Sequence, residues 1–393
     1  MNFQLTSDQQ ILVDSIRRYC VDNFPLGGNR QAAQSEPRLR DQWSSFARLG
    51  ATGVTFGNDV GGSAQSLVEL VLIMQELGRR LVRLPFITCV VLAGQILDYA
   101  ADPQRRLELL SPMIAGESLL AAAYEEENCD NGTMNTQASP TPRGYRISGC
   151  KWLPCGHLEA DMFIVSAYCG LNSHSALFAV PRSTEGMTIK QFATLDDDVA
   201  LELHFDDAEI PASSMIADGN RASAAMSHAH RHGIVALCAE AMGAMESVVT
   251  ATAEHLKSRV AYGVPLSSLQ VLQHKLADMV AERELSRSVM YRAINALVNH
   301  DEPTMESAVA TAKAYMGDSA RSIAATALQL HGAAGFARDN VISSYFKKLN
   351  AFGLRLGTTD HHVKQLAGHW DTRVRQSTLS DQIPNQAPSG ART

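Results

Sequence analysis

The 393-residue chain lacks the features that mark several classes of protein. It has 34 Lys and Arg against 41 Asp and Glu, a formal net charge of −7, which gives no general attraction to nucleic acid or to an anionic membrane. No apolar run reaches the roughly 20 residues of a membrane span. Hydrophobic residues at 45% suffice for the cores of two or three domains. We therefore expect a globular protein with no nucleic-acid or membrane partner.

The seven cysteines form no disulfide framework, because their number is odd and their spacing is irregular. Residues 1–5 show no cationic region leading into an apolar core. Both observations fit a reducing compartment, and we expect a cytoplasmic location. Cys150, Cys155 and His157 lie close in sequence but lack the paired Cys-x-x-Cys of a zinc site. We interpret them as thiols in strands and turns, and expect no metal.

Three changes of pattern divide the chain. Residues 1–116 show helical periodicity, whereas residues 117–219 contain short apolar runs separated by Gly, Pro, Asn and Ser. Within the latter, residues 200–205 alternate with period two, as in a half-buried strand. Residues 220–375 return to helical spacing, and residues 376–393 have the composition of a disordered tail. This order predicts a mainly α fold with a central β-domain.

Three spaced blocks carry a family resemblance. They are Arg259-Val-Ala-Tyr-Gly-Val-Pro-Leu-Ser-Ser-Leu-Gln270, Gln329-Leu-His-Gly332 and Leu356-Gly-Thr358. In this order they resemble the acyl-CoA dehydrogenases, and the resemblance covers residues 1 to about 370. It implies an N-terminal α-helical domain, a β-barrel-like middle domain and a C-terminal four-helix bundle. The closer resemblance is to the small subunits of bacterial heteromeric pairs, such as the pimeloyl-CoA and steroid side-chain types.

The resemblance implies FAD as the cofactor and indicates which residues would hold it. Arg259 would bind the pyrophosphate through its guanidinium, and Gly332 would let the backbone approach a phosphate. Tyr262 stands where the family usually has a Phe that packs on the cofactor. Except for Thr358, these positions reach the FAD of a neighbouring subunit in the family. The full set is Arg259, Tyr262, Gln270, Gln329, Gly332 and Thr358.

The position of the family's catalytic base is changed. Family members remove the α-proton of an acyl-CoA with a Glu just before Gly-Thr, while the β-hydrogen leaves as hydride to the flavin. Here that position is Leu356, which has no lone pair to accept a proton. Relatives that place the Glu on an earlier helix would have it at Gly233. We assign no catalytic residue in this chain, and Asp360 and His361 are the substitute bases to weigh.

The segments that would build the chain's own flavin pocket have changed most. Residues 124–131 replace the usual Thr-Glu-x-x-Ala-Gly-Ser-Asp loop with adjacent carboxylates that would repel a flavin or phosphate. Trp152-Leu-Pro154 replaces the Trp-Ile-Thr that holds the flavin ring. This uneven loss predicts a subunit that completes the FAD site of a homologous partner in a heterotetramer. The resemblance further implies a bulky or dicarboxylic acyl-CoA substrate and an electron-transfer flavoprotein as acceptor.

Two alternatives stay open. One is an autonomous homotetrameric flavoenzyme with a displaced base at Asp360 or His361, or with a reaction that needs no α-base. The other is a structural or regulatory binding protein on the same scaffold, without flavin. The flavin content of the chain, alone and with a partner, separates the three hypotheses.

Overall fold

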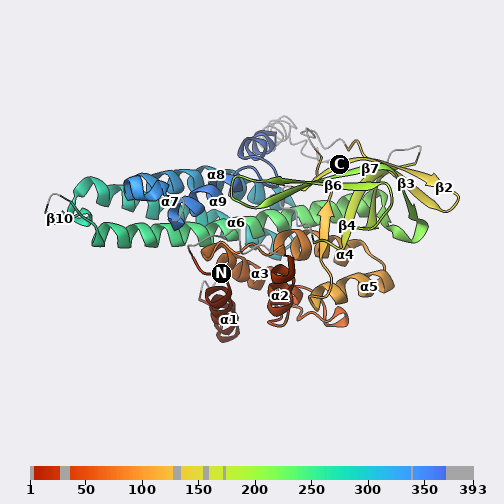
Figure 1. The fold of residues 1–393 in the computed structure, drawn as a ribbon, viewed down its shortest axis with the longest axis horizontal. Coiled ribbons are helices and arrows are strands. Elements are labelled where there is room, and N and C mark those ends of the chain that lie inside the picture. The colour runs from red at the N-terminus through yellow and green to blue at the C-terminus, as the bar shows by residue number, and fades with distance from the viewer. Residues whose placement is uncertain are drawn as a thin grey trace, which may run out of the picture.

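The computed structural model describes residues 4–26, 36–126, 134–153, 159–170, 174–261, 263–337 and 340–368. Helices come first, then strands, then helices again, which confirms the predicted fold class (Figure 1). Several residues named above lie outside the described part of the chain: Tyr262, Cys155, His157, residues 127–131 and the predicted tail.

The N-terminal helices begin at residues suited to cap them. Ser66 accepts a hydrogen bond from the backbone N–H of Val68, and Glu69 accepts one in return from the backbone N–H of Ser66. Asp102 caps α5, where Pro103 occupies the first turn. The elements are α1 Ser7–Asn23, α2 Glu36–Ala47, α3 Leu67–Arg79, the π-helical turn Ile87–Gly94, α4 Gln95–Ala100 and α5 Pro103–Ile114.

The central β-domain is one mixed sheet in the order β6-β7-β3-β2-β4-β5-β8, with β1 parallel to β4. Strand β7 shows the predicted alternation: Leu201, Leu203 and Phe205 are buried, whereas Glu202 and His204 lie partly exposed on the other face. The strands are β1 Leu120–Ala123, β2 Gln137–Thr141, β3 Gly144–Leu153, β4 Met162–Cys169, β5 His174–Pro181, β6 Met187–Ala193, β7 Val199–Pro211 and β8 Met215–Asp218.

A single long helix, α6 Gly219–Ser258, runs through the molecule. At 1.5 Å per residue its 40 residues span about 60 Å, from the β-domain to the small hairpin of β9 Val260–Ala261 and β10 Val264–Pro265 (Figure 1). It is long and apolar enough to cross a membrane, but 83% of its most apolar window is buried inside the protein. It packs with α7 Gln270–Val298, α8 Glu302–His331 and α9 Val341–Phe352.

Two glycines let α3 and α6 cross at close range. A Cβ added to Gly78 would lie 1.9 Å from the carbonyl oxygen of Glu240, and one added to Gly243 would lie 1.9 Å from that of Gln75. No side chain fits at either position, because the opposing atoms belong to backbone. The crossing fixes the N-terminal helices against the bundle, and so positions the walls of the site described next.

Candidate functional site

The loop after α9 holds Leu356 in an unusual backbone conformation. Leu356 has φ 52°, in the left-handed region that residues with a branched side chain rarely adopt, and Gly357 follows with φ 87°. The ammonium of Lys313 donates to the carbonyl oxygens of Phe352 at 3.0 Å and Gly357 at 3.1 Å. His362 Nε2 lies 2.9 Å from the carbonyl oxygen of Leu356. Lys313 and His362 therefore hold the backbone of this loop in place. The side chain of Leu356 offers no base.

The space around Leu356 is nearly filled. Its side chain is 4% exposed and borders a cavity of about 20 Å³, enough for roughly one water molecule. A Cβ added to Gly233 would lie 2.5 Å from Leu92 and 3.1 Å from Leu356, so that position is closed as well. Other lining residues include Tyr124, Glu125, Trp152, Leu237 and Arg355. Among the described residues, the cavity that Leu356 borders is therefore too small for an acyl thioester.

Buried ion pairs lie beside this cavity. The guanidinium of Arg355 bonds the carboxylates of Asp196 at 2.8 Å and Asp198 at 3.2 Å. Lys348 pairs with the buried carboxylate of Glu240 at 3.0 Å. Between these groups only about 30 Å³ is open. Charged side chains, among them Glu240, Lys348 and Arg355, therefore line this space together with apolar ones.

The two carboxylates after β1 that the structure describes, Glu125 and Glu126, have different surroundings. Burial opposes ionisation of Glu126, but hydrogen bonds from Lys151 at 2.5 Å and Thr136 at 2.7 Å outweigh it and lower its pKa to about 2. Glu125 instead borders the cavity beside Leu356, and burial raises its pKa to about 7. The sequence signal for this contact is Lys151, in the Gly149-x-Lys151-Trp152 stretch, because it is the cation that meets Glu126.

The proposed substitute bases lie elsewhere. Asp360 is exposed, and the backbone N–H of His361 donates to the hydroxyl of Thr358 at 3.1 Å. Neither Asp360 nor His361 lines the cavity at Leu356. The carboxyl that does line it is Glu125, which sequence reasoning treated only as a source of repulsion.

Four of the predicted cofactor contacts lie at the far end of the helical bundle. Arg259 caps the C-terminus of α6, Gln270 begins α7, and Gly332, with φ 60°, ends α8. The rings of His255 and His331 stack at 4.2 Å, which joins the ends of α6 and α8. All four contacts are exposed, and we call them together the bundle end: Arg259, Gln270, Gln329 and Gly332.

The bundle end and the Leu356 loop are far apart. Gly233 lies beside Leu356, and 26 residues separate it from Arg259 along α6, which corresponds to about 39 Å. Thr358 lies two residues beyond Leu356 and so belongs to the loop. The structure thus divides the predicted contacts into two groups. A dinucleotide bound at one of them would not reach the other within the same chain.

Apolar side chains surround the bundle end. Val260 is 56% exposed, Val264 39%, Val271 62% and Phe336 66%. A groove of about 480 Å³ lies between α6 and α7 and is lined by apolar residues that include Leu256, Leu276 and Val280. Exposed apolar area that borders polar groups is typical of a surface covered by another protein.

Comparison with known proteins gives the family. The model of the acyl-CoA dehydrogenase N-terminal domain matches residues 6–117, and that of the C-terminal domain matches residues 223–369. The chain belongs to the acyl-CoA dehydrogenase family, whose cofactor is FAD.

Relatives match along nearly the whole chain. A probable acyl-CoA dehydrogenase of Bacillus subtilis is 25% identical over 92% of this chain and 97% of its own length. The acryloyl-CoA reductase (NADH) of Anaerotignum propionicum is 24% identical over 93% and 95%. Among solved structures, the ChsE4–ChsE5 complex from Mycobacterium tuberculosis superposes with TM-score 0.84 at 22% identity, covering 94% of this chain and 99% of that one. The Tcur3481–Tcur3483 steroid acyl-CoA dehydrogenase variant superposes with TM-score 0.83 at 25% identity, with the same coverage.

Proposed function

We propose that this chain is one subunit of a heteromeric FAD-dependent acyl-CoA dehydrogenase. In this assembly it completes the FAD site of a homologous partner, and the partner supplies the catalytic carboxylate. The observation that carries the proposal is the contrast between Leu356 and the bundle end. Leu356 is buried and borders a cavity of about 20 Å³, whereas the four predicted contacts of the bundle end are exposed.

The Leu356 loop supports the first half of the proposal. α,β-Desaturation needs a base at the α-proton and room for a thioester against the flavin ring. Leu356 supplies no base, and the cavity that it borders among the described residues, about 20 Å³, is too small for a thioester.

The bundle end supports the second half. Arg259 presents an exposed guanidinium at a helix end, suited to a pyrophosphate through two parallel hydrogen bonds. A Cβ placed at Gly332 would meet nothing within 4 Å, so that backbone is open to a phosphate. FAD bound there would supply the hydride acceptor for the partner's chemistry. This chain would contribute binding and orientation only.

The partner we propose is a homologous dehydrogenase chain, with two copies of each in the tetramer. The exposed valines and the groove between α6 and α7 provide the apolar surface that such a contact needs. One similar solved structure is described as a complex of two chains, and another as a steroid acyl-CoA dehydrogenase with a paired name. We therefore propose a bulky acyl-CoA as substrate and an electron-transfer flavoprotein as acceptor.

The test is flavin content and native mass, measured on the chain made alone and on the chain co-expressed with a neighbouring dehydrogenase gene. We expect a colourless chain alone, and a yellow heterotetramer with about one flavin per pair. A lone chain that is a yellow tetramer with about one flavin each, and that oxidises acyl-CoA, would overturn the proposal.

A second candidate function is an autonomous flavoenzyme, and Glu125 is the observation that favours it. Its carboxyl borders the cavity beside Leu356, and its raised pKa of about 7 suits a general base. This function would require the cavity to open when flavin and substrate bind. The displaced base would then be Glu125, because Asp360 and His361 do not line the cavity.

A further inference from the structure

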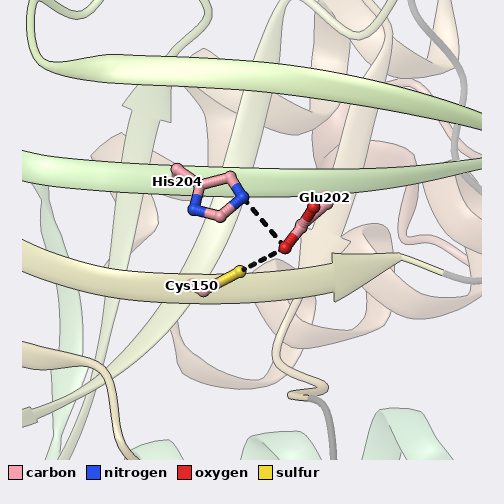
Figure 2. Close-up of side chains that lie close together, drawn as sticks. All are labelled: Cys150, Glu202 and His204. Carbon is pink, nitrogen blue, oxygen red and sulfur yellow. Dashed lines mark hydrogen bonds and ion pairs between the residues drawn. The ribbon is translucent and has the colours of Figure 1, made fainter.

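Three potential metal ligands converge on the partly exposed face of the sheet. Cys150 on β3 is paired directly with His204 on β7, and Glu202 lies two residues earlier on β7, so all three share one face. Cys150 Sγ lies 3.4 Å from Glu202 Oε1, and His204 Nε2 lies 2.9 Å from the same oxygen (Figure 2). All three ligand atoms fall within 4.8 Å of one another.

His204 Nε2 lies close to two polar groups that it cannot hydrogen-bond at the same time. His204 Nε2 lies 3.2 Å from the ammonium of Lys190 and 2.9 Å from the carboxylate of Glu202. An ammonium only donates and a carboxylate only accepts. A neutral Nε2 can accept from Lys190 or donate to Glu202, but not both. A protonated imidazole would satisfy Glu202 and then face the ammonium of Lys190 with a like charge.

We propose that Cys150, Glu202 and His204 form a binding site for a divalent transition-metal ion of the zinc class. Sulfur, nitrogen and oxygen donors together suit Zn²⁺ or Co²⁺ rather than Mg²⁺ or Ca²⁺. Bonds of about 2.0 Å to nitrogen and oxygen and about 2.3 Å to sulfur place tetrahedral ligand atoms about 3.3 to 3.5 Å apart. The observed separations are 2.9 Å between nitrogen and oxygen and 3.4 Å between sulfur and oxygen, and the sulfur–nitrogen separation is at most 4.8 Å.

The charges balance when the metal binds. Cys150 loses its thiol proton to the buffer as the metal–sulfur bond forms, and no electrons are transferred. The thiolate and the carboxylate of Glu202 then neutralise a dication, while His204 stays neutral. Lys190 is 59% exposed and can turn into solvent. The fourth position of the metal would face solvent and take a water molecule.

The site would link β3 to β7 close to the flavin-ring position that the sequence predicts. Trp152 lies two residues beyond Cys150, is paired with Glu202, and borders the cavity at Leu356. The ion would therefore hold two neighbouring strands in register at this edge of the cavity. The proposal does not depend on the heteromeric function, because it uses only residues of this chain.

The test is a Co²⁺ titration of the full chain after treatment with a chelator, followed by optical absorption and by competition with Zn²⁺. We expect about one Co²⁺ per chain, with the absorption band of a cobalt–thiolate bond. Cys150→Ser should abolish that band. Glu202→Gln and His204→Ala should each weaken Co²⁺ binding by at least about tenfold. Lys190→Met removes the competing ammonium and should tighten Co²⁺ binding.

Other thiols provide the control. Cys20, Cys89, Cys169 and Cys238 are buried, and among the described residues Cys150 is the cysteine in a group of three potential ligands. A band that survives in Cys150→Ser would place the metal on another thiol and overturn the proposal. So would binding that is unchanged in both Glu202→Gln and His204→Ala. Thermal unfolding without metal shows whether each variant is folded before it is titrated.

Discussion

The guanidinium of Arg355 bonds the carboxylate of Asp196 at 2.8 Å, with the two side chains 6% and 1% exposed. Asp196 lies between β6 and β7, and Arg355 follows α9, so this ion pair fastens the β-domain to the helical bundle. Arg355 also borders the residual cavity beside Leu356. The ion pair therefore joins the two domains and holds Arg355 beside the cavity.

Removing this guanidinium should destabilise the protein strongly. Arg355→Ala removes the guanidinium that the buried carboxylates of Asp196 and Asp198 share, and we expect a loss of about 3–5 kcal/mol in the free energy of unfolding. Arg321→Ala is the matched control, because its pair with Asp318 is exposed and should contribute less than about 1 kcal/mol. Denaturant titration of both variants measures this. Equal midpoints for the two would show that the buried ion pair is not structural.

A substitution at the bundle end should lower flavin content only in the complex with the partner. Arg259→Ala should lower the flavin content of the co-expressed pair and leave the stability of the lone chain within about 0.5 kcal/mol, because Arg259 is exposed. Arg321→Ala, which is also exposed but lies outside the groove and the bundle end, should leave flavin content unchanged. Flavin absorbance per protein mass is the measurement. The assignment of Arg259 fails if both variants retain full flavin.

Glu125 separates the two candidate functions. In the heteromer the partner supplies the base, so Glu125→Gln should leave turnover of the pair within a few fold of wild type. In an autonomous enzyme that uses Glu125, turnover should fall by about 10²–10⁴. Asp360→Asn and His361→Ala serve as controls, because neither residue lines the cavity. Steady-state rates with acyl-CoA and an artificial electron acceptor decide between them.

His230 should account for part of the loss of stability at acid pH. Burial, followed by neighbouring histidines His362 and His361, lowers the pKa of His230 from 6.5 to about 4. Between these values the unfolded chain binds the extra proton, so stability is complete above pH 6.5 and falls as pH drops toward 4. His230→Gln should reduce this pH slope by up to about one proton. Tyr124→Phe removes only the hydrogen-bonding hydroxyl near His230 Nδ1 and should keep the slope.

Restoring a carboxyl at the family's base position should not restore activity to the lone chain. Leu356→Glu would bury a carboxyl among Leu92, Leu237 and Ile87, with about 20 Å³ of open space. We expect a loss of about 1–3 kcal/mol in stability and no oxidation of acyl-CoA. Unfolding midpoints and turnover of the variant made alone are the measurements. Turnover above that of wild type would show that the pocket opens readily.

Sequence patterns predicted the parts of this protein that depend on local chemistry. The period-two run at residues 200–205 became β7, and the helical spacing after residue 220 became α6. Short-range preference sets such elements, because backbone geometry and the burial of one face act within a few residues. The order of the blocks around Arg259, Gln329 and Leu356 likewise identified the family.

Long-range contacts escaped that reasoning. The sequence showed three adjacent carboxylates after β1, but it did not show that Glu126 meets Lys151 while Glu125 turns toward the cavity. Nor did the separation of residues 150 and 202 in the chain show that their side chains meet. Such pairings follow from strand register and helix crossings, which are set by packing of the whole domain.

By itself the sequence determined the family, the order of helical and strand regions, and the absence of a base at Leu356, because these depend on residue identity and local periodicity. The tertiary structure decided that the Leu356 pocket is nearly closed and that Arg259 lies about 39 Å from it along α6. It also decided which charged side chains pair, such as Lys151 with Glu126 and Arg355 with Asp196. These properties depend on distances between residues remote in the chain, and only the folded packing fixes such distances.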